Sequence, residues 1–458
     1  MKRFVLLALF FASTAHAAAP PLDPATRQVI RDIYQQLIEI NTTESVGNMT
    51  TAAEAMAARL RAAGFPAADV QVLVPEPRHG NLVARLHGSG AKKPLLLLAH
   101  LDVVEARRED WSTDPFKLVE TGGYFYARGS GDDKAMASIW IATLIRLKQE
   151  HFVPDRDIIV ALTSDEETGD YNGADWLVKN HRDLIDAAFA INEGGGGAIK
   201  DGKYLFNGVG ASEKVYVTFA LTVHNKGGHS SVPQNPNAIY QLAAGLGRLA
   251  AFDFPVSLNE VTRTYFRRLA DVQGGPLGAD MRAVADNNDA AAAARIAQTP
   301  AYNARMRTTC VATRLDAGHA DNALPQTAKA TVNCRVLPGE DPEEVQKTLV
   351  RVLNDPAIEV SWIDRAKPSV PSPLTTEIMQ PVESLSRQFW DVPVIPLMAT
   401  GASDSLYLRN AGIPTYGISA IFEDIKESRA HGKDERVGVQ QFYDSAQFLY
   451  ALVKQLSS

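Results

Sequence analysis

Acidic residues and histidine follow several apolar, strand-like segments of this chain. The apolar run 94–99 leads into a His-x-Asp pattern, and the segments 158–162 and 187–191 each lead into glutamate. An Asp-Asp-Lys run stands directly before a predicted helix at 135–148. Strand ends of an open α/β sheet meet at one edge, where ligands bind, so we expect these polar side chains to form one site. They are His100, Asp102, Asp132, Asp133, Glu166, Glu167 and Glu193.

Each motif taken alone has an ordinary explanation. A His-x-Asp pattern is common without function, an Asp-Asp pair before a helix is a favourable N-cap, and an acidic run is usually a solvated turn. Together the motifs suit metal chemistry, with His100 as a ligand and Asp102 placed to accept its second ring N–H. A carboxylate before the helix can bridge two cations, and adjacent glutamates can divide metal binding from base chemistry. The chain has only two cysteines, so the ligands must be His, Asp and Glu.

With these motifs, the chain resembles the co-catalytic dizinc metallopeptidases, the family of aminoacylase-1, glutamate carboxypeptidase, succinyl-diaminopimelate desuccinylase and carnosinase-type dipeptidases. The resemblance rests on five ordered motifs and covers essentially the whole mature chain. It implies two zinc ions per chain, with cobalt or manganese able to substitute. It also implies a last histidine ligand near the C-terminus, which the segment 430–436 supplies. The implied ligands are His100, Asp132 and Glu193 on one ion, and Asp132, Glu167 and His431 on the other.

The resemblance also assigns roles to the residues around the metals. Glu166 matches the general base, and Asp102 the partner that orients the first histidine ligand. Glu193 stands at a position where family members carry either Asp or Glu. The peptide bond after the bridging aspartate is often cis in the family, so the resemblance suggests a cis bond between Asp132 and Asp133.

His229 and Asn322 extend the resemblance into the predicted lid. His229, in a Gly-Gly-His-Ser-Ser run, resembles a histidine that reaches the substrate carbonyl, often from the partner subunit of a dimer. The alternative is a turn histidine beside flexible glycines. Asn322, in Asp-Asn-Ala-Leu-Pro, resembles a substrate-contacting asparagine of the same lid.

Three further residues resemble the part of the family's pocket that holds the substrate carboxylate and its surroundings. Arg335 matches an arginine whose planar fork grips a carboxylate in bidentate fashion. Gly401 and Ser403 belong to a loop that resembles the family's Gly-Gly-Thr-Asp loop. Ala402 and Ser403 depart from that pattern.

The elements that must position these residues are predicted from periodicity. Strand and helix alternate between 94 and 191, which predicts an α/β fold with a zinc-peptidase-like mixed sheet and helices on both faces. After Gly210 a β-α-β-β-α-β order predicts an inserted ferredoxin-like α+β lid or dimerisation domain, enlarged by an Ala-rich helical segment at 279–305. The first fold resumes near Pro373 and ends in a helix at 440–456. We therefore expect a catalytic domain at 18–212 and 366–458 and a lid at 213–365.

The first 17 residues have the features of a secretory signal peptide. The chain begins Met-Lys-Arg, continues with an apolar run at 4–12, and reaches Ala-His-Ala at 15–17, the pattern read by signal peptidase. The apolar run is too short to anchor the chain across about 30 Å of hydrocarbon. We expect a mature chain that begins near Ala18, carries no membrane anchor and is secreted, into a bacterial periplasm.

The composition bears on partners and on redox state. The 458 residues are 45% hydrophobic and 22% charged, which is typical of a soluble globular protein. The formal net charge is -7, and the chain has no basic stripe, which argues against nucleic acid as a partner. Cys310 and Cys334 lie in strand-like segments that can be neighbours in one sheet. A disulfide and two buried free thiols both remain open.

We expect an exported dizinc hydrolase that cleaves the amide bond next to a free carboxylate in a small peptide or an N-acyl amino acid. A carboxypeptidase or dipeptidase is the first choice, and an N-acyl-amino-acid amidohydrolase (aminoacylase) the second. A non-catalytic periplasmic binding protein is a remote alternative, disfavoured by the base at Glu166. The absence of a Gly-x-Ser-x-Gly elbow disfavours a serine hydrolase. The resemblance suggests a homodimer through the lid, unless the helical segment at 279–305 completes the site within one chain.

Overall fold

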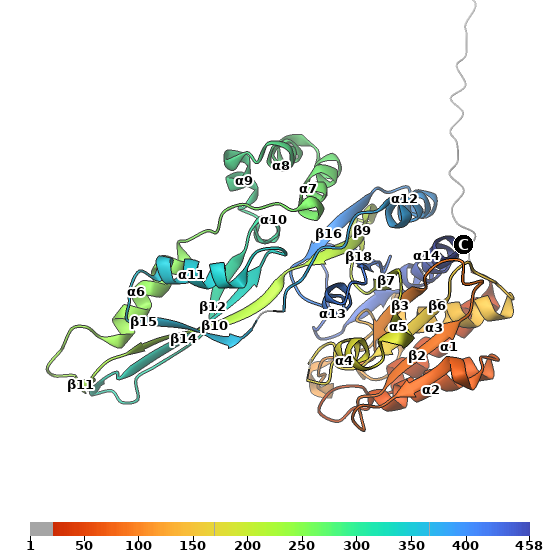
Figure 1. The fold of residues 1–458 in the computed structure, drawn as a ribbon, viewed down its shortest axis with the longest axis horizontal. Coiled ribbons are helices and arrows are strands. Elements are labelled where there is room, and N and C mark those ends of the chain that lie inside the picture. The colour runs from red at the N-terminus through yellow and green to blue at the C-terminus, as the bar shows by residue number, and fades with distance from the viewer. Residues whose placement is uncertain (1–21, 169, 366) are drawn as a thin grey trace, which may run out of the picture.

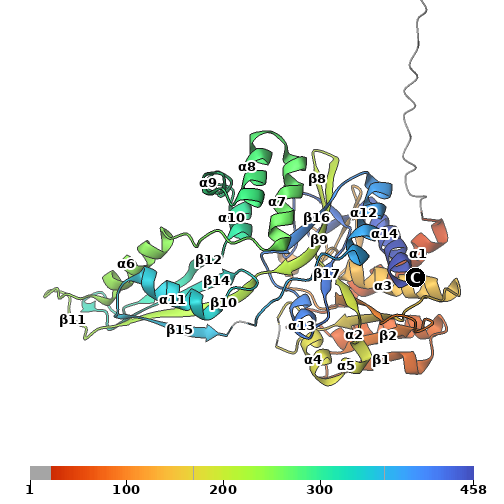
Figure 2. The ribbon, with the colours of Figure 1, turned by 45° about the horizontal axis from the view of Figure 1, so that its top comes forward.

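The computed structural model describes residues 22–168, 170–365 and 367–458 of the chain. They form a large α/β body, which carries both ends of the described chain, and a narrower α+β body that extends from one side of it (Figures 1 and 2). The predicted signal peptide and cleavage point lie outside the described residues. None of the described helices combines the length and apolar character that a membrane crossing requires.

The large body is built on a mixed sheet of ten strands. Its strand order is β1-β2-β6-β3-β7-β17-β9-β8-β18, and β16 pairs with β9. Strands β6, β3 and β7 are parallel neighbours. The strands are β1 (Val70–Leu73), β2 (Asn81–Leu86), β3 (Leu95–His100), β6 (Ile158–Thr163), β7 (Phe189–Asn192), β8 (Gly196–Lys200), β9 (Lys203–Glu213), β16 (Val394–Ala399), β17 (Thr415–Gly417) and β18 (Phe422–Asp424).

Both faces of this sheet are covered by helices, which explains why its central strands are continuously apolar. Side chains alternate across β3: Leu95 and Leu97 join one core cluster, and Leu96 and Leu98 join the other. The first face packs against α1 (Pro24–Glu39), α2 (Met49–Ala62), α3 (Lys134–Gln149), α12 (Thr376–Trp390) and α14 (Val439–Ser457). The second packs against α4 (Gly173–Asn180), α5 (Arg182–Ile185) and α13 (Ser405–Asn410).

A small sheet and two short turns complete the large body. A three-stranded sheet has the order β19-β5-β4, so that the chain near residue 436 lies beside the segment that precedes α3. These strands are β4 (Val119–Thr121), β5 (Tyr124–Tyr126) and β19 (Arg436–Gly438), and the 3-10 turns are η1 (Ala67–Asp69) and η2 (Arg108–Asp110).

The small body has the predicted β-α-β-β-α-β order. Its four strands are antiparallel in the order β12-β14-β10-β15, and α6 and α11 pack on one face of them. A two-stranded ribbon of β11 and β13 lies at its far end. The elements are β10 (Val215–His224), β11 (Gly228–His229), α6 (Ala238–Ala250), β12 (Thr309–Ala317), β13 (Ala323–Leu324), β14 (Thr327–Val336), α11 (Pro342–Leu353) and β15 (Ile358–Asp364).

Cys310 and Cys334 stand opposite each other on β12 and β14 and are joined by a disulfide. The bond therefore ties an edge strand of the small body to its neighbour. Of the two states that the sequence left open, the structure contains the disulfide.

The helical segment between α6 and β12 packs differently from our expectation. It comprises α7 (Glu260–Gln273), α8 (Gly275–Asn287), α9 (Ala290–Ile296) and α10 (Pro300–Met306). Instead of enlarging the small body, it shares a core cluster with Ile395 on β16, an outer strand of the large sheet. Arg268 fixes this docking through Glu383 at 2.6 Å and the Val394 carbonyl at 2.8 Å. The apolar face of α7 is buried in this way, because β16 lies close enough to cover it.

Candidate active site

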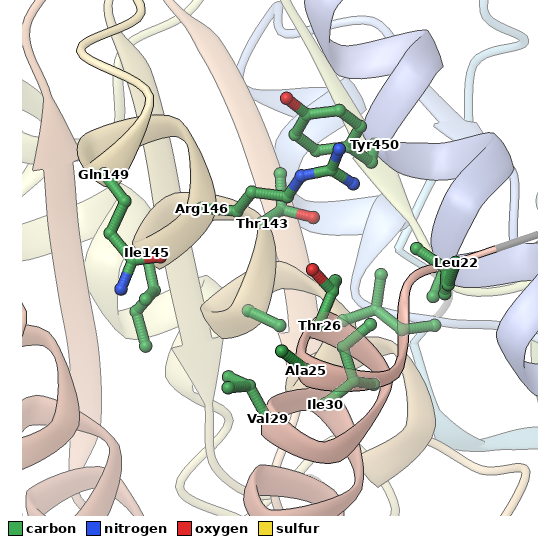
Figure 3. A pocket seen from close by; sticks show the side chains of 13 residues that line it. Leu22, Ala25, Thr26, Val29, Ile30, Thr143, Ile145, Arg146, Gln149 and Tyr450 are labelled. Atoms are coloured by element: carbon green, nitrogen blue, oxygen red, sulfur yellow. The ribbon is translucent and has the colours of Figure 1, made fainter.

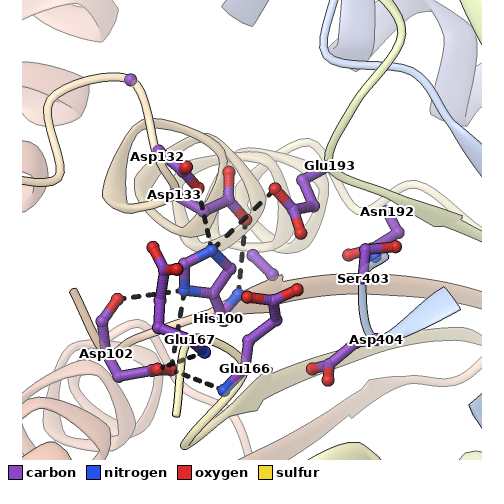
Figure 4. A network of polar contacts seen from close by, with 12 residues as sticks. His100, Asp102, Asp132, Asp133, Glu166, Glu167, Asn192, Glu193, Ser403 and Asp404 are labelled. Atoms are coloured by element: carbon purple, nitrogen blue, oxygen red, sulfur yellow. Dashed lines mark hydrogen bonds and ion pairs between the residues drawn. The ribbon is translucent and has the colours of Figure 1, made fainter. Parts of the chain in front are cut away.

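The polar residues that follow the strands of the large sheet converge at one edge, as the sequence predicts (Figure 4). His100 is the last residue of β3, and Glu193 comes directly after β7. Glu166 and Glu167 follow β6, the other parallel neighbour of β3. Asp132 stands just before α3. Because parallel strands end at the same edge, residues far apart in the chain become neighbours here.

Asp132 lies between two imidazoles. Its Oδ1 atom is 3.0 Å from His100 Nε2, and its Oδ2 atom is 3.2 Å from His431 Nε2. His431 Nε2 is also 3.1 Å from a carboxylate oxygen of Glu167, and His100 Nε2 is 3.9 Å from Glu193. The Asp132–Asp133 peptide bond is cis, as the resemblance suggests. One carboxylate thus faces both histidines, which is the arrangement that a bridging ligand requires.

The second ring nitrogen of His100 is held by Asp102 in a way that the sequence did not predict. Its Nδ1 atom is 3.0 Å from the backbone carbonyl of Asp102 and 3.5 Å from the carboxylate. The carboxylate instead accepts the backbone N–H groups of Glu166, at 3.2 Å, and Glu167, at 2.9 Å. Asp102 therefore orients the histidine mainly through its main chain and fixes both glutamates through its side chain.

Burial and mutual repulsion dominate the electrostatics of these acids. Burial raises the pKa of Glu166 to about 9, with the charges of Asp404 and Glu167 adding to the effect. The pKa values of Glu167 and Glu193 are raised by burial as well. Burial also acts to raise the pKa of Asp132, but hydrogen bonds to the two histidines outweigh it and hold that pKa below its usual value.

The donor set suits divalent cations. Within the described residues, ligand atoms of His100, Asp132 and Glu167 all lie within 4.8 Å of one another, and so do those of a second group formed by His100, Glu166 and Glu193. Nitrogen and carboxylate oxygen are the donors that zinc and manganese accept. Several carboxylates crowd around two imidazoles, and bound cations would offset that negative charge and lower the raised pKa values. The residues present therefore fit metal binding.

Glu435 is a buried residue of the site that our sequence reasoning passed over. Its carboxylate accepts the backbone N–H groups of Gly129, at 3.0 Å, and Gly131, at 2.8 Å, and forms an ion pair of 2.7 Å with Arg128. These contacts hold the loop that presents Asp132. The sequence could have pointed to Glu435, because it lies in the same 430–436 segment that supplies the predicted histidine ligand.

A second set of buried polar residues makes hydrogen bonds at the ends of the strands that carry the cluster. Asp404 accepts hydrogen bonds from Thr163 at 2.8 Å and from Asn172 at 2.6 Å, and burial raises its pKa to about 6. Asp133 accepts the backbone N–H of His100 at 3.3 Å. Asp404 and Asp133 thus tie the ends of β6 and β3 to the starts of α13 and α3.

His229 and Asn322 do not reach this cluster within one chain. They lie on or beside the ribbon of β11 and β13, where the Ser230 N–H donates to the Asn322 carbonyl at 3.0 Å. His229 is exposed, and its Nδ1 atom contacts the hydroxyl of Ser231 at 2.7 Å. The ribbon is the end of the small body farthest from the large sheet (Figures 1 and 2). A role for His229 therefore requires a second subunit or a large movement of the small body.

Arg335 and Ser403 lie nearer the junction of the two bodies. Arg335, near the end of β14, stacks over the ring of Tyr216 at 4.6 Å, and burial lowers its pKa. Ser403 donates to Glu213 at 3.0 Å, and Glu213 forms a buried ion pair of 3.0 Å with Arg409. Gly401 is exposed in the same loop as Ser403. This loop is therefore tied to the last residue of β9, where the chain leaves the large body.

Two cavities differ in their relation to the cluster. One of about 210 Å³ is lined by Asp132, Glu193 and the glycine run that follows Glu193. Another of about 140 Å³ has a mainly apolar lining from α1, α3 and α14, near Ile145 and Tyr450, towards the other end of α3 (Figure 3). Of these two cavities, only the first is lined by residues of the acidic cluster.

The fold and the ligand cluster agree with what is found by comparison with known proteins. Residues 96–455 match the family model described as Peptidase family M20/M25/M40. This match covers more than half of the chain, so the protein belongs to that family and is a hydrolase whose family uses metal ions. The resemblance to aminoacylase-1 and its relatives is thereby confirmed.

Three known proteins show how similar the chain is to individual relatives. The chain is 32% identical over 378 residues to the N-fatty-acyl-amino acid synthase/hydrolase PM20D1 of Xenopus tropicalis, covering 79% of this chain and 72% of that protein. It is 25% identical over 405 residues to mouse aminoacylase-1, covering 87% and 88%. The M20 family metallo-carboxypeptidase Sso-CP2 from Sulfolobus solfataricus superposes with a TM-score of 0.68 at 18% identity, covering 95% of this chain and 100% of that one. The last comparison confirms the mixed α/β fold class.

Proposed function

We propose that this protein is an exported two-zinc amidohydrolase that cleaves the amide bond of N-acyl amino acids, next to the free carboxylate. The observation that carries the proposal is the position of Asp132 between His100 and His431, with its two oxygens 3.0 and 3.2 Å from their Nε2 atoms. A carboxylate placed in this way can serve two cations at once. The names of the relatives, one for N-fatty-acyl amino acids and one for aminoacylase, favour the acyl substrate.

A carboxypeptidase or dipeptidase is the second candidate, favoured by the superposition on a metallo-carboxypeptidase of the same fold. Both reactions release a product with a free carboxylate from the same kind of amide. They differ in whether the group on the acyl side carries an α-amine. A substrate panel therefore separates the two.

The proposed ligands are His100, Asp132, Glu167, Glu193 and His431, with Asp132 shared between the ions. When bound, two zinc ions would polarise the substrate carbonyl and lower the pKa of a water molecule. Proton transfer is assigned to a side chain of the protein. Glu166 takes the proton of the attacking water and passes it to the leaving amine, which is the usual double role of a general acid-base residue.

Substrate positioning is assigned to residues outside the metal cluster. Arg335 is proposed to hold the substrate carboxylate, and the loop with Gly401 and Ser403 to line the pocket beside it. His229 and Asn322 are proposed to act from the partner subunit of a homodimer, because the described chain places them at the far end of its own small body. His229 would then stabilise the developing negative charge on the carbonyl oxygen.

Export is proposed from the first 17 residues alone, which begin with positive charge, continue with an apolar run and end in Ala-His-Ala. An exported enzyme of this kind would recover amino acids from acylated or peptide material outside the cytoplasm. Mass spectrometry of the protein isolated from its native host tests this point, because a mature N-terminus near residue 18 is expected.

The central test compares the wild type with Glu166→Gln and with Glu54→Gln, a control at an exposed glutamate 3.6 Å from Arg61. Each protein is tested for metal content and for hydrolysis of N-acyl amino acids, N-blocked dipeptides and free dipeptides. We expect about two zinc ions per chain in all three proteins and a turnover loss of about 10²- to 10⁴-fold in Glu166→Gln alone. A metal-free active wild type, or a fully active Glu166→Gln variant, would contradict the proposal.

A further inference from the structure

We infer that His79 is a positioning residue for the proposed base Glu166 and acts on it through Asp165. His79 lies in the turn before β2, a segment to which the proposed function gives no role. The inference rests on that function, because it concerns how the base is held. It also adds a residue that lies outside the ligand motifs.

The backbone next to the base has an unusual conformation. Asp165 directly precedes Glu166 and has a φ of 57°, in the left-handed region that residues with a Cβ atom rarely adopt. The conformation of Asp165 determines the direction in which the chain leaves β6 and hence where Glu166 points. Such a conformation persists only when surrounding contacts hold it in place.

His79 provides the contact to the Asp165 side chain. Its Nδ1 atom is 2.7 Å from Asp165 Oδ2, and the side chains of His79 and Asp165 are only 8% and 1% exposed. The ring of Tyr171 packs on the imidazole with their centroids 4.6 Å apart. A buried carboxylate needs a partner of this kind, because it has lost the water that would otherwise stabilise it.

The segment around His79 also accepts hydrogen bonds from Ser164, the residue before Asp165. The His79 carbonyl accepts the hydroxyl of Ser164 at 3.2 Å, and Asn81 Oδ1 accepts the Ser164 N–H at 3.0 Å. A Cβ atom on Gly173 would lie 1.8 Å from that same Asn81 oxygen, so the three segments are packed without spare room. The turn before β2 therefore clamps the end of β6 through both main chain and side chain.

The contacts of this clamp are separate from those of Asp102. Asp102 holds the N–H groups of Glu166 and Glu167 and also orients the ligand His100, so its loss disturbs metal binding and base together. The described side-chain contacts of His79 are with Asp165 and Tyr171, and neither is a proposed ligand. Loss of His79 should consequently move the base while the ligand set stays intact.

The test compares His79→Ala and His79→Gln with the wild type, all as full-length metal-loaded protein. His87→Ala is the matched control, because His87 is an exposed histidine at the end of β2 whose Nε2 atom is 3.0 Å from Asp69. We expect kcat to fall by about 10- to 100-fold in His79→Ala, since a base displaced by about 1 Å loses that much rate. KM and metal content should stay within about twofold of wild type, and His79→Gln, whose amide can donate to Asp165, should recover most of the loss.

A second comparison asks whether His79 acts through Glu166. In a Glu166→Ala background, assayed at high enzyme concentration, adding His79→Ala should leave the residual rate unchanged, because residues that act as a unit are not additive. A His79→Ala protein with wild-type kcat, with reduced metal content, or with a further loss in the Glu166→Ala background would overturn the inference. Should His79→Ala not fold, Asp165→Asn probes the same contact from its other end, and an unchanged kcat there has the same meaning.

The two proposals fail in different ways. If the wild type hydrolyses none of the amide panel, or does so without Glu166, the proposed function is wrong. If the wild type depends on Glu166 but His79→Ala and Asp165→Asn keep full turnover, only the positioning role of His79 is wrong.

Discussion

The carboxylate of Asp102 accepts the backbone N–H of Glu166 at 3.2 Å. This contact joins the end of β3, which supplies the first histidine of the cluster, to the loop after β6, which supplies the proposed base. The backbone carbonyl of Asp102 meanwhile contacts His100 Nδ1 at 3.0 Å. One residue thus couples the orientation of a proposed metal ligand to the position of the proposed base.

Replacing Asp102 should therefore affect metal binding and turnover at the same time. We expect Asp102→Ala to weaken metal affinity by about 10- to 100-fold, which is typical when the partner of a ligand is lost. The carbonyl contact to His100 survives in this variant, so metal binding should be weakened without being abolished. Competition with a chelator measures the affinity, and kcat is measured at saturating metal. Unchanged affinity with reduced kcat would show that the carboxylate serves only the base.

Mixing two inactive variants tests whether His229 acts across a dimer. In a heterodimer of His229→Ala and Glu166→Ala subunits, one of the two sites would have both an intact base and an intact partner histidine. Refolding an equal mixture should then restore about one quarter of the wild-type activity, because half of the dimers are mixed and each has one working site. Each variant refolded alone is the control. No recovery in a mixture proven to contain heterodimers would contradict the shared site.

The Cys310–Cys334 bond should contribute measurably to stability. It closes a segment of 24 residues between β12 and β14, and a disulfide of this kind typically stabilises a protein by about 2–4 kcal/mol. We expect the Cys310→Ala/Cys334→Ala variant to lose that much free energy of unfolding in urea denaturation. Adding dithiothreitol should destabilise the wild type to the same extent and leave the variant unchanged. Equal stability of the two proteins without reductant would count against the prediction.

Lys214 should make stability depend on pH. This lysine is 1% exposed, and burial lowers its pKa from 10.5 to about 7 in the folded protein. Between these two values the unfolded chain binds the proton and the folded chain does not, so the free energy of unfolding rises with pH across that range. Compared with Lys214→Met, the wild type should therefore gain stability from about pH 7 to about pH 10.

Urea denaturation at several pH values measures this difference. Lys92→Met, at an exposed lysine with 44% of its side chain accessible, is the control and should follow the wild type. If the wild type and Lys214→Met show the same dependence on pH, Lys214 does not titrate as its burial predicts.

Most of the large body was predictable because its signals are local. The apolar runs at 94–99 and 158–162 became β3 and β6, and the helix expected at 135–148 became α3 (Lys134–Gln149). Polar residues at the ends of such strands must meet at one sheet edge, and the structure brings them together there. The same reasoning missed Glu435, because its role depends on backbone N–H groups more than 300 positions earlier in the chain.

The sequence by itself determined the family, the fold class and the residues at the proposed metal cluster, because residue type and spacing encode strand ends, helix starts and ligand chemistry. Only the tertiary structure decided which atoms meet. In the tertiary structure, the Asp102 carboxylate accepts a backbone N–H of Glu166 and α7 packs on β16. His229 lies far from the cluster of its own chain. Those outcomes depend on how apolar faces pack and how buried polar groups find partners across long separations, which no local pattern records.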